Sequence, residues 1–184
     1  AVWAFNPANT WVASHTTTTA ADGGYLLENV RATSYRLLFA PTAASGLAPE
    51  WYDNARTRRL ATSVDVLTGQ TLTGIDVQLE GAGAISGSVT DANGNPVADV
   101  AVRVYGPGDG FGGSYLATTA ADGSYLFARV RPGDQYTVRF APPTGSGFAT
   151  EWYDNAATRS TAQSVAVAAG QTVTGIDAVL ESST

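Results

Sequence analysis

The sequence contains no cysteine and no lysine, and it has a single histidine, His15. The absence of cysteine excludes disulfides and thiolate metal sites, and the absence of lysine excludes intramolecular Lys–Asn isopeptide bonds. One histidine cannot form a two-histidine metal site, and no Gly-x-Ser-x-Gly motif accompanies it for a Ser–His–Asp triad. We therefore expect a chain without these cross-links and without these catalytic centres.

Charge is also sparse: charged residues make up 14% of the chain, and the formal net charge is −6. All ten basic residues are arginines, and they are scattered apart from the small cluster Arg56, Arg58 and Arg59. The chain thus lacks the basic stripe that follows a phosphate backbone, so we expect no nucleic-acid partner. No apolar run approaches the roughly 18 residues of a transmembrane helix, so we expect no membrane insertion.

What the sequence does contain is an internal repeat. The motif Ala20-Ala-Asp-Gly-Gly-Tyr-Leu26 returns as Ala120-Ala-Asp-Gly-Ser-Tyr-Leu126, and Glu50-Trp-Tyr-Asp-Asn-Ala55 returns as Glu151-Trp-Tyr-Asp-Asn-Ala156. This self-similarity predicts two related modules. The first copy has no counterpart of the segment that precedes the second. We predict domains at residues 1–80 and 84–184 with a linker at 81–83, and one strand missing from the first domain.

Strand patterns fill both modules. Tyr136, Val138 and Phe140 alternate with smaller or polar residues, and residues 75–80 and 100–104 alternate in the same way. This period of two is typical of strands with one buried face. Turns rich in Gly, Asn and Pro separate the strands. Because the second module holds about seven short strands, we predict an all-β fold with two packed sheets.

Three segments of the second copy carry a family resemblance. They are Ile85-Ser-Gly-Ser-Val-Thr-Asp-Ala-Asn-Gly-Asn-Pro-Val97, Thr119-Ala-Ala-Asp-Gly-Ser-Tyr-Leu-Phe127 and Gln135-Tyr-Thr-Val-Arg-Phe140. The chain resembles the carboxypeptidase regulatory-like domain, a family related to collagen-adhesin B-type repeats and to starch-binding-domain-like folds. The resemblance implies two tandem seven-stranded prealbumin-like (transthyretin-like, Ig-like) β-sandwich modules, the first without its N-terminal strand. It also implies an extracellular protein of bacterial type, secreted or at the cell surface.

One loop has the ligand spacing of a calcium site. Asp91, Asn93 and Asn95 place oxygen ligands at alternate positions, as calcium loops do. The later Glu of a complete loop is missing, and Pro96 follows at once. The same residues are also typical of an ordinary turn between two strands. Two alternatives stay open: the loop holds calcium, or the chain has no cofactor.

Adjacent aromatic residues, followed by Asp and Asn, stand in the longest connection of each module. Two neighbouring side chains of an extended segment cannot both point inward, so at least one is expected at the surface. Exposed rings would form a platform on which sugars stack; in the alternative interpretation the Trp closes the end of the sandwich. The candidate ligand-binding residues are Trp51, Tyr52, Asp53, Asn54, Trp152, Tyr153, Asp154 and Asn155.

These observations favour a binding or structural role over catalysis. The carboxylate pairs Glu50–Asp53 and Glu151–Asp154 lie in short loops without room for a deep cleft, so we expect no enzyme. We expect a spacer or adhesive segment of a larger protein, with a protein or polysaccharide at a cell surface as partner. The alternative is a carbohydrate-binding module, for starch or another glycan, accessory to a glycoside hydrolase. The open edge of the first module would also allow head-to-tail self-association.

Overall fold

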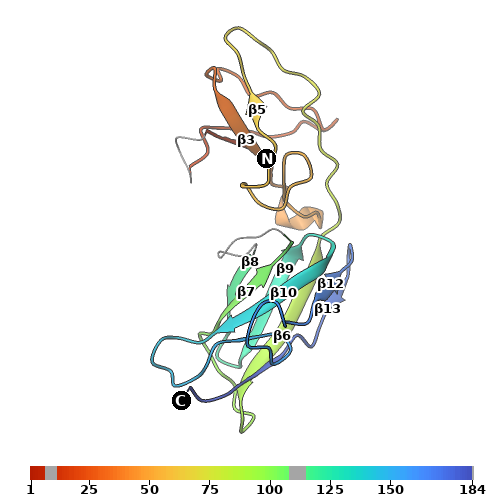
Figure 1. Cartoon of the computed structure of the whole chain (residues 1–184). Helices are drawn as coiled ribbons and strands as arrows, with labels where there is room; N and C mark the ends of the chain where they lie inside the picture. The colour runs from red at the N-terminus through yellow and green to blue at the C-terminus, as the bar shows by residue number, and fades with distance from the viewer. Residues whose placement is uncertain (7–11, 108–114, 184) are drawn as a thin grey trace. The chain divides into compact units, whose positions relative to one another are not determined.

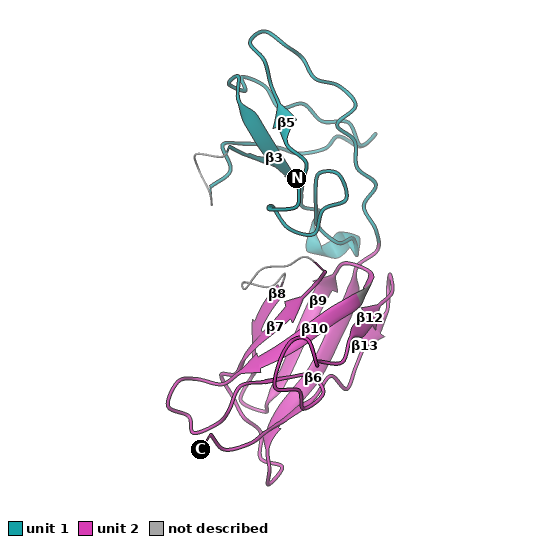
Figure 2. Ribbon diagram, in the orientation of Figure 1, with its two compact units in different colours: residues 1–80 teal, residues 81–184 magenta. Residues whose placement is uncertain are grey.

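The computed structural model describes residues 1–6, 12–107 and 115–183. The chain divides into two compact units, residues 1–80 (unit 1) and residues 81–184 (unit 2), coloured separately in Figure 2. Both units are built from strands, and the described residues add only the 3₁₀ turn Ala43–Ser45 (η1). The predicted all-β class is confirmed. Among the described residues, no helical segment has the length and apolar character needed to cross a membrane.

Unit 2 contains two sheets (Figure 1). In the first sheet the order is β11-β10-β7-β8, and β12 also pairs with β10. In the second sheet β6 is central, because β9, β13 and β14 all pair with it. The strands are β6 Gly83–Asp91, β7 Ala101–Tyr105, β8 Tyr115–Thr118, β9 Ser124–Val130, β10 Gly133–Ala141, β11 Glu151–Trp152, β12 Val165–Val167, β13 Thr172–Val173 and β14 Ala178–Leu180. β6 thus begins within the residues that the sequence predicts as linker.

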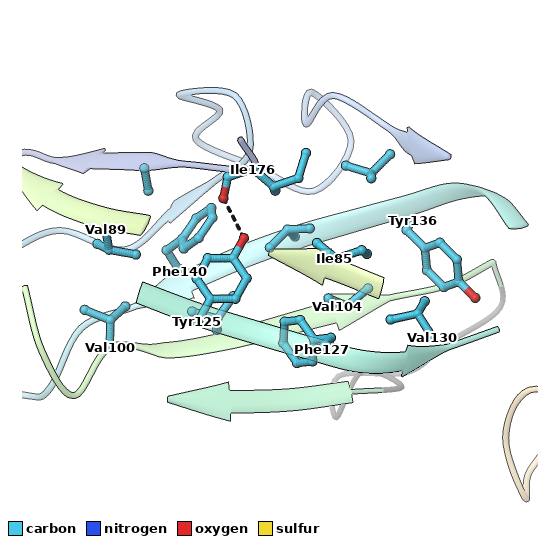
Figure 3. Close-up of a cluster of buried hydrophobic side chains, with 14 of the residues drawn as sticks. Ile85, Val89, Val100, Val104, Tyr125, Phe127, Val130, Tyr136, Phe140 and Ile176 are labelled. Atoms are coloured by element: carbon cyan, nitrogen blue, oxygen red, sulfur yellow. Dashed lines mark hydrogen bonds between the residues drawn. The ribbon is translucent and has the colours of Figure 1, made fainter. Parts of the chain in front are cut away.

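The alternation of side chains explains the core of unit 2. Val102 and Val104 on β7, and Tyr136, Val138 and Phe140 on β10, all have 0% of their surface exposed. Successive side chains of a strand point to opposite faces, so every second residue enters the space between the sheets. Figure 3 shows this cluster of aliphatic and aromatic side chains. Burial of this apolar surface is the main source of stability for the unit.

Unit 1 has one sheet among its described residues. Its order is β2-β1-β3-β4, with β5 also pairing with β3. The repeat matches this sheet to the β11-β10-β7-β8 sheet of unit 2. The strands are β1 Val2–Phe5, β2 His15–Thr17, β3 Ser34–Phe39, β4 Glu50–Trp51 and β5 Val64–Asp65.

The second sheet has no counterpart in the described part of unit 1. The repeat aligns residues 24–30, 71–72 and 77–79 with β9, β13 and β14, yet none of these segments is a strand. The strand predicted over residues 75–80 is therefore wrong. In unit 2 the equivalent strands are held by hydrogen bonds to β6, and residues 1–6 and 12–80 of unit 1 contain no strand at that position. The alternation of residues 75–80 is correct, but among the described residues no strand lies beside this segment as β6 lies beside β14.

Candidate functional site

The Trp-Tyr-Asp-Asn loops are closed by the same pair of backbone hydrogen bonds in both units. The amide of Trp51 donates to the Ala55 carbonyl and the amide of Ala55 to the Trp51 carbonyl, both at 3.0 Å. The equivalent pair in unit 2, Trp152 and Ala156, exchanges two bonds of 2.8 Å. Asp and Asn tolerate the left-handed backbone that such tight loops require, and Asn54 has a φ of 60°. The Asp-Asn pair thus serves the turn itself.

The two tryptophans are partly buried by a neighbouring aromatic ring. The Trp51 ring centroid lies 5.1 Å from that of Phe5, and the Trp152 ring centroid lies 5.1 Å from that of Tyr105. These distances are typical of aromatic pairs that contribute to stability. Each tryptophan therefore has a ring partner on its own unit and presents the remainder of its surface to solvent.

An arginine completes each stack. The Arg58 guanidinium lies 5.2 Å from the Phe5 ring centroid, and that of its repeat equivalent Arg159 lies 4.9 Å from the Tyr105 ring centroid. Both also donate to a backbone carbonyl, Arg159 to that of Gly106 at 2.9 Å. Burial and the nearby Arg36 lower the pKa of Arg58. Sequence reasoning missed these arginines, because they are about fifty residues from the ring that they cover.

Tyr52 and Tyr153 point the other way, as expected for adjacent residues. Tyr52 packs against the core cluster of unit 1, and Tyr153 packs against that of unit 2. The next residue, Asp53, is exposed, and its Oδ2 accepts a 2.7 Å hydrogen bond from the Thr62 hydroxyl. Asp154 and Asn155 are exposed in unit 2. The predicted platform residues therefore do not share one face: the Trp, Asp and Asn side chains reach the surface, and the Tyr side chains line the core.

The outward face of the unit 1 sheet carries an additional tryptophan. Trp3 is 39% exposed, and its ring centroid is 6.5 Å from that of Phe5. Leu38 pairs with Trp3 on one side and with Trp51 on the other. We call Trp3, Phe5, Leu38 and Trp51 the aromatic face of unit 1. The alternation of Val2 with Trp3 along β1 is the sequence signal that predicts an exposed tryptophan, and hence a contact surface, at this position.

The corresponding face of unit 2 has a different chemistry. The repeat replaces Trp3 with Arg103 and Leu38 with Arg139, and these two arginines pair across β7 and β10. Unit 2 therefore has two arginines where unit 1 has Trp3 and Leu38. A ligand with flat apolar faces, such as a sugar ring, would distinguish between the two units at this position.

One carboxyl group in the unit 2 loop is electrostatically unusual. Partial burial, followed by repulsion from Glu181 and Asp154, raises the pKa of Glu151 to about 6 from 4.5. Glu151 and Asp154 are the pair considered above as glycosidase carboxylates. Both lie outside the lining of the cavity described below. The shift therefore reports first the partial burial of the carboxyl and then the like charges of Glu181 and Asp154.

The predicted calcium loop is closed by its own hydrogen bonds. Asp91 Oδ1 accepts the amides of Asn93 and Asn95 at 2.9 and 2.8 Å, and Asp91 Oδ2 accepts the Asn95 side-chain amide at 2.9 Å. The bonds from Asn95 lower the pKa of Asp91. No group of three His, Asp or Glu side chains in the described residues is arranged to hold a metal. The turn accounts for all three residues, and calcium binding stays a prediction.

A hollow lies in unit 1, on the inner face of its sheet. Its volume is about 870 Å³, and side chains from β3 and from residues 23–30 and 66–76 line it. We call it the groove. Apolar lining residues include Tyr25, Leu27, Val30, Leu72 and Ile75. The open edge predicted from the sequence is thus an apolar hollow.

The family model described as carboxypeptidase regulatory-like domain matches residues 84–181. No protein with a curated description matches. Among solved structures, the Bacillus anthracis TIE protein is 16% identical with a TM-score of 0.39 over 98% of this chain and 30% of its own. A Streptococcal ancillary pilin is 16% identical with a TM-score of 0.29 over 76% of this chain and 42% of its own. The chain therefore spans less than half of either protein.

Proposed function

The chain belongs to the carboxypeptidase regulatory-like domain family, and from that premise we propose that it is a non-catalytic structural segment of a larger secreted or cell-surface protein. In this role the segment carries tension or holds a neighbouring part of the protein away from its attachment point. Adhesion to a protein or polysaccharide would add a binding surface to the same scaffold. Both roles need a stable fold and neither needs a reaction centre.

The observation that carries the proposal is the arrangement of the first and last strands of unit 2. β6 and β14 are parallel neighbours, with Ala178 opposite Val89 and Leu180 opposite Asp91. Tension applied before β6 and after β14 pulls the two strands in opposite directions along their length. All hydrogen bonds between them are then loaded together in shear, whereas a peeling force loads them one at a time. This geometry suits a segment under load.

The polar groups of the repeated motifs also have structural partners. Asp122 Oδ1 accepts the Ser124 amide at 3.0 Å and its hydroxyl at 2.6 Å, which caps the Asp-Gly turn. The Ser88 amide and hydroxyl both donate to Asp177 Oδ1, at 2.7 and 3.0 Å. Such bonds hold turns and strands in place. They support a scaffold role for the groups that would otherwise be candidates for chemistry.

Force spectroscopy with cysteine handles tests the proposal, since the chain has no cysteine of its own. Handles at Gly81→Cys and Ser183→Cys load β6 and β14 in shear. Handles at Ala92→Cys and Ser183→Cys pull on the C-terminal ends of β6 and β14, which lie next to each other. Force applied there peels the two strands apart. We expect unit 2 to unfold at a several-fold higher force in the first geometry. Equal forces in the two geometries would contradict the load-bearing role.

A second candidate function, carbohydrate binding, is favoured by the aromatic face of unit 1. Trp3 and Trp51 flank Phe5 on that face, and exposed Asp53 and Asn54 stand next to Trp51. Exposed aromatic rings provide apolar area at low entropic cost, and adjacent polar groups can bond to hydroxyls. Because unit 2 has Arg103 in place of Trp3, we propose that unit 1 supplies the stronger site.

Retention on insoluble glucan tests this candidate. Trp3→Ala and Trp51→Ala should each reduce retention at least tenfold, and Trp152→Ala should reduce it less. Circular dichroism of each variant checks that the fold is kept. Retention that is absent from the wild-type chain, or that survives both unit 1 substitutions, would exclude a glycan platform on this face.

A further inference from the structure

The groove of unit 1 lies where unit 2 holds its central strand. Residues that line the groove have repeat equivalents in the closed core of unit 2: Tyr25 corresponds to Tyr125, and Ile75 corresponds to Ile176. Tyr125 and Ile176 are each 5% exposed, whereas Tyr25 and Ile75 are only partly buried. The apolar side chains are therefore in place in both units, and what differs is the strand that covers them.

Unit 2 shows how such a strand is held. Ile85 and Val89 of β6 are 0% exposed and enter the core, where they belong to the same buried cluster as Phe140 and Tyr125 (Figure 3). Between them lies Gly87, where an added Cβ would overlap the Ile176 carbonyl. Only glycine allows so close an approach of two backbones. The strand therefore needs two branched apolar side chains separated by a glycine.

The groups that bind β6 in unit 2 are repeated in unit 1. The Tyr125 hydroxyl donates to the Ile176 carbonyl at 2.5 Å, and the Tyr25 hydroxyl donates to the Ile75 carbonyl at 2.7 Å. This bond holds the loop that contains Ile176 in place, and β6 runs alongside that loop. Asp76 stands at the position of Asp177, the carboxylate that accepts two bonds from β6. Unit 1 thus retains the bracing bond and the acceptor group of an occupied site.

We propose that the groove of unit 1 is a strand-acceptor site for a polypeptide segment from outside these 184 residues, of about nine residues and with the β6 pattern Ile-x-Gly-x-Val. The segment would run antiparallel to residues 24–30 and parallel to residues 71–79, as β6 does to β9, β13 and β14. Added strands gain affinity from backbone hydrogen bonds and specificity from alternate side chains.

The source of the segment follows from the state of β6. Within the chain the pattern belongs to β6 itself, and Ile85 and Val89 are fully buried in unit 2. Donation of β6 by a second copy would expose that core and remove the central strand of three pairings. A segment from outside these 184 residues fills the groove without this loss.

A synthetic peptide of residues 83–97, labelled with a fluorophore, tests the proposal on the full chain. We expect saturable binding at one peptide per chain and a rise in the unfolding temperature of unit 1, with that of unit 2 unchanged. The matched control is the same peptide with Gly87→Val, which should bind at least tenfold more weakly. On the chain, Leu27→Asp in the groove should weaken binding at least tenfold, and Leu60→Asp, at a position 43% exposed and outside the groove, should not.

Three outcomes would overturn the proposal. One is the absence of saturable binding, and another is equal affinity of the wild-type and Gly87→Val peptides; neither depends on the folding of a chain variant. The third is a concentration-dependent ladder of oligomers that the peptide dissolves, because it would make β6 of a second copy the occupant. This last result would instead support the head-to-tail self-association that the open edge allows.

Discussion

The repeat places an isoleucine at equivalent positions of the two units, which allows a direct comparison of the closed unit 2 with the open unit 1. Ile176 is 5% exposed within the core of unit 2, and its equivalent Ile75 is partly buried at the groove. Truncation of a buried isoleucine to alanine costs about 2–5 kcal/mol, including the cavity that it leaves. We expect Ile176→Ala to cost about 3 kcal/mol. Ile75→Ala should cost about 1 kcal/mol, because folding removes less apolar surface of Ile75 from contact with water.

Calorimetry of the full chain measures both effects. For domains of this size, about 1 kcal/mol shifts the melting temperature by roughly 4–8 °C. Ile176→Ala should therefore lower the unit 2 transition by roughly 15 °C, and Ile75→Ala should lower the unit 1 transition by roughly 5 °C. Each substitution should leave the other unit's transition in place. Equal costs at Ile75 and Ile176 would refute the reasoning, because they would mean that unit 1 has a core as closed as that of unit 2.

Three further predictions use other matched or titratable positions. Tyr125→Phe leaves the buried Ile176 carbonyl, the acceptor of the 2.5 Å bond, unsatisfied and should lower the free energy of unfolding by about 1–3 kcal/mol. Tyr25→Phe removes a partly buried 2.7 Å bond and should lower it by about 0.5–1 kcal/mol, both measured by thermal unfolding. Asp177→Ala removes two hydrogen bonds to β6 and should cost about 1–2 kcal/mol in urea unfolding, and Asp76→Ala should be nearly neutral. The pKa of Glu151 is raised to about 6, so the folded chain binds the Glu151 proton more tightly than the unfolded chain does, and the stability of the fold falls as pH rises from about 4.5 to about 6. The Glu151→Gln variant cannot lose this proton. It should therefore melt at a higher temperature than wild type at pH 7 and at the same temperature below pH 4.5.

Each of these comparisons can fail in a specific way. Equal costs for the two tyrosine substitutions would show that the hydroxyl bonds are equally buried. A loss at Asp76→Ala as large as that at Asp177→Ala would indicate a strand already bound in unit 1. A constant melting difference between Glu151→Gln and wild type from pH 4 to pH 7 would remove the titration as its cause. Glu28→Gln, at an exposed position, is the control for the last experiment.

The sequence predicted the fold as far as local patterns reach. The alternation of Tyr136, Val138 and Phe140 correctly identifies which side chains enter the core, and the family resemblance drawn from the second copy is confirmed. The same alternation over residues 75–80 predicts a strand that is not formed. Periodicity identifies the buried face of a segment but says nothing of whether a hydrogen-bonding partner exists. The parallel pairing of β6 with β14 is equally invisible to local patterns, because its residues are far apart in the chain.

The candidate site was also predictable only in part, because local patterns do not report contacts between distant segments. Adjacent aromatics in the loop indicated that Trp51 and Tyr52 do not both point inward, and in the structure Tyr52 packs on the core while Trp51 stacks on Phe5. The ring that covers Trp51 and the arginine that covers that ring come from other segments, which no loop motif can identify. The groove depends on a strand that is not among the described residues of unit 1, so its shape required three-dimensional coordinates.

Hydrogen exchange of backbone amides measures the central claim most directly, since exchange reports which amides are held in stable sheet hydrogen bonds. In unit 2, residues 124–130 and 172–180 should be protected to nearly the global stability of the unit. In unit 1, residues 24–30 and 71–79 should exchange rapidly, and should gain protection when the peptide of residues 83–97 is added. Strong protection of both unit 1 segments without the peptide would contradict an open strand-acceptor groove.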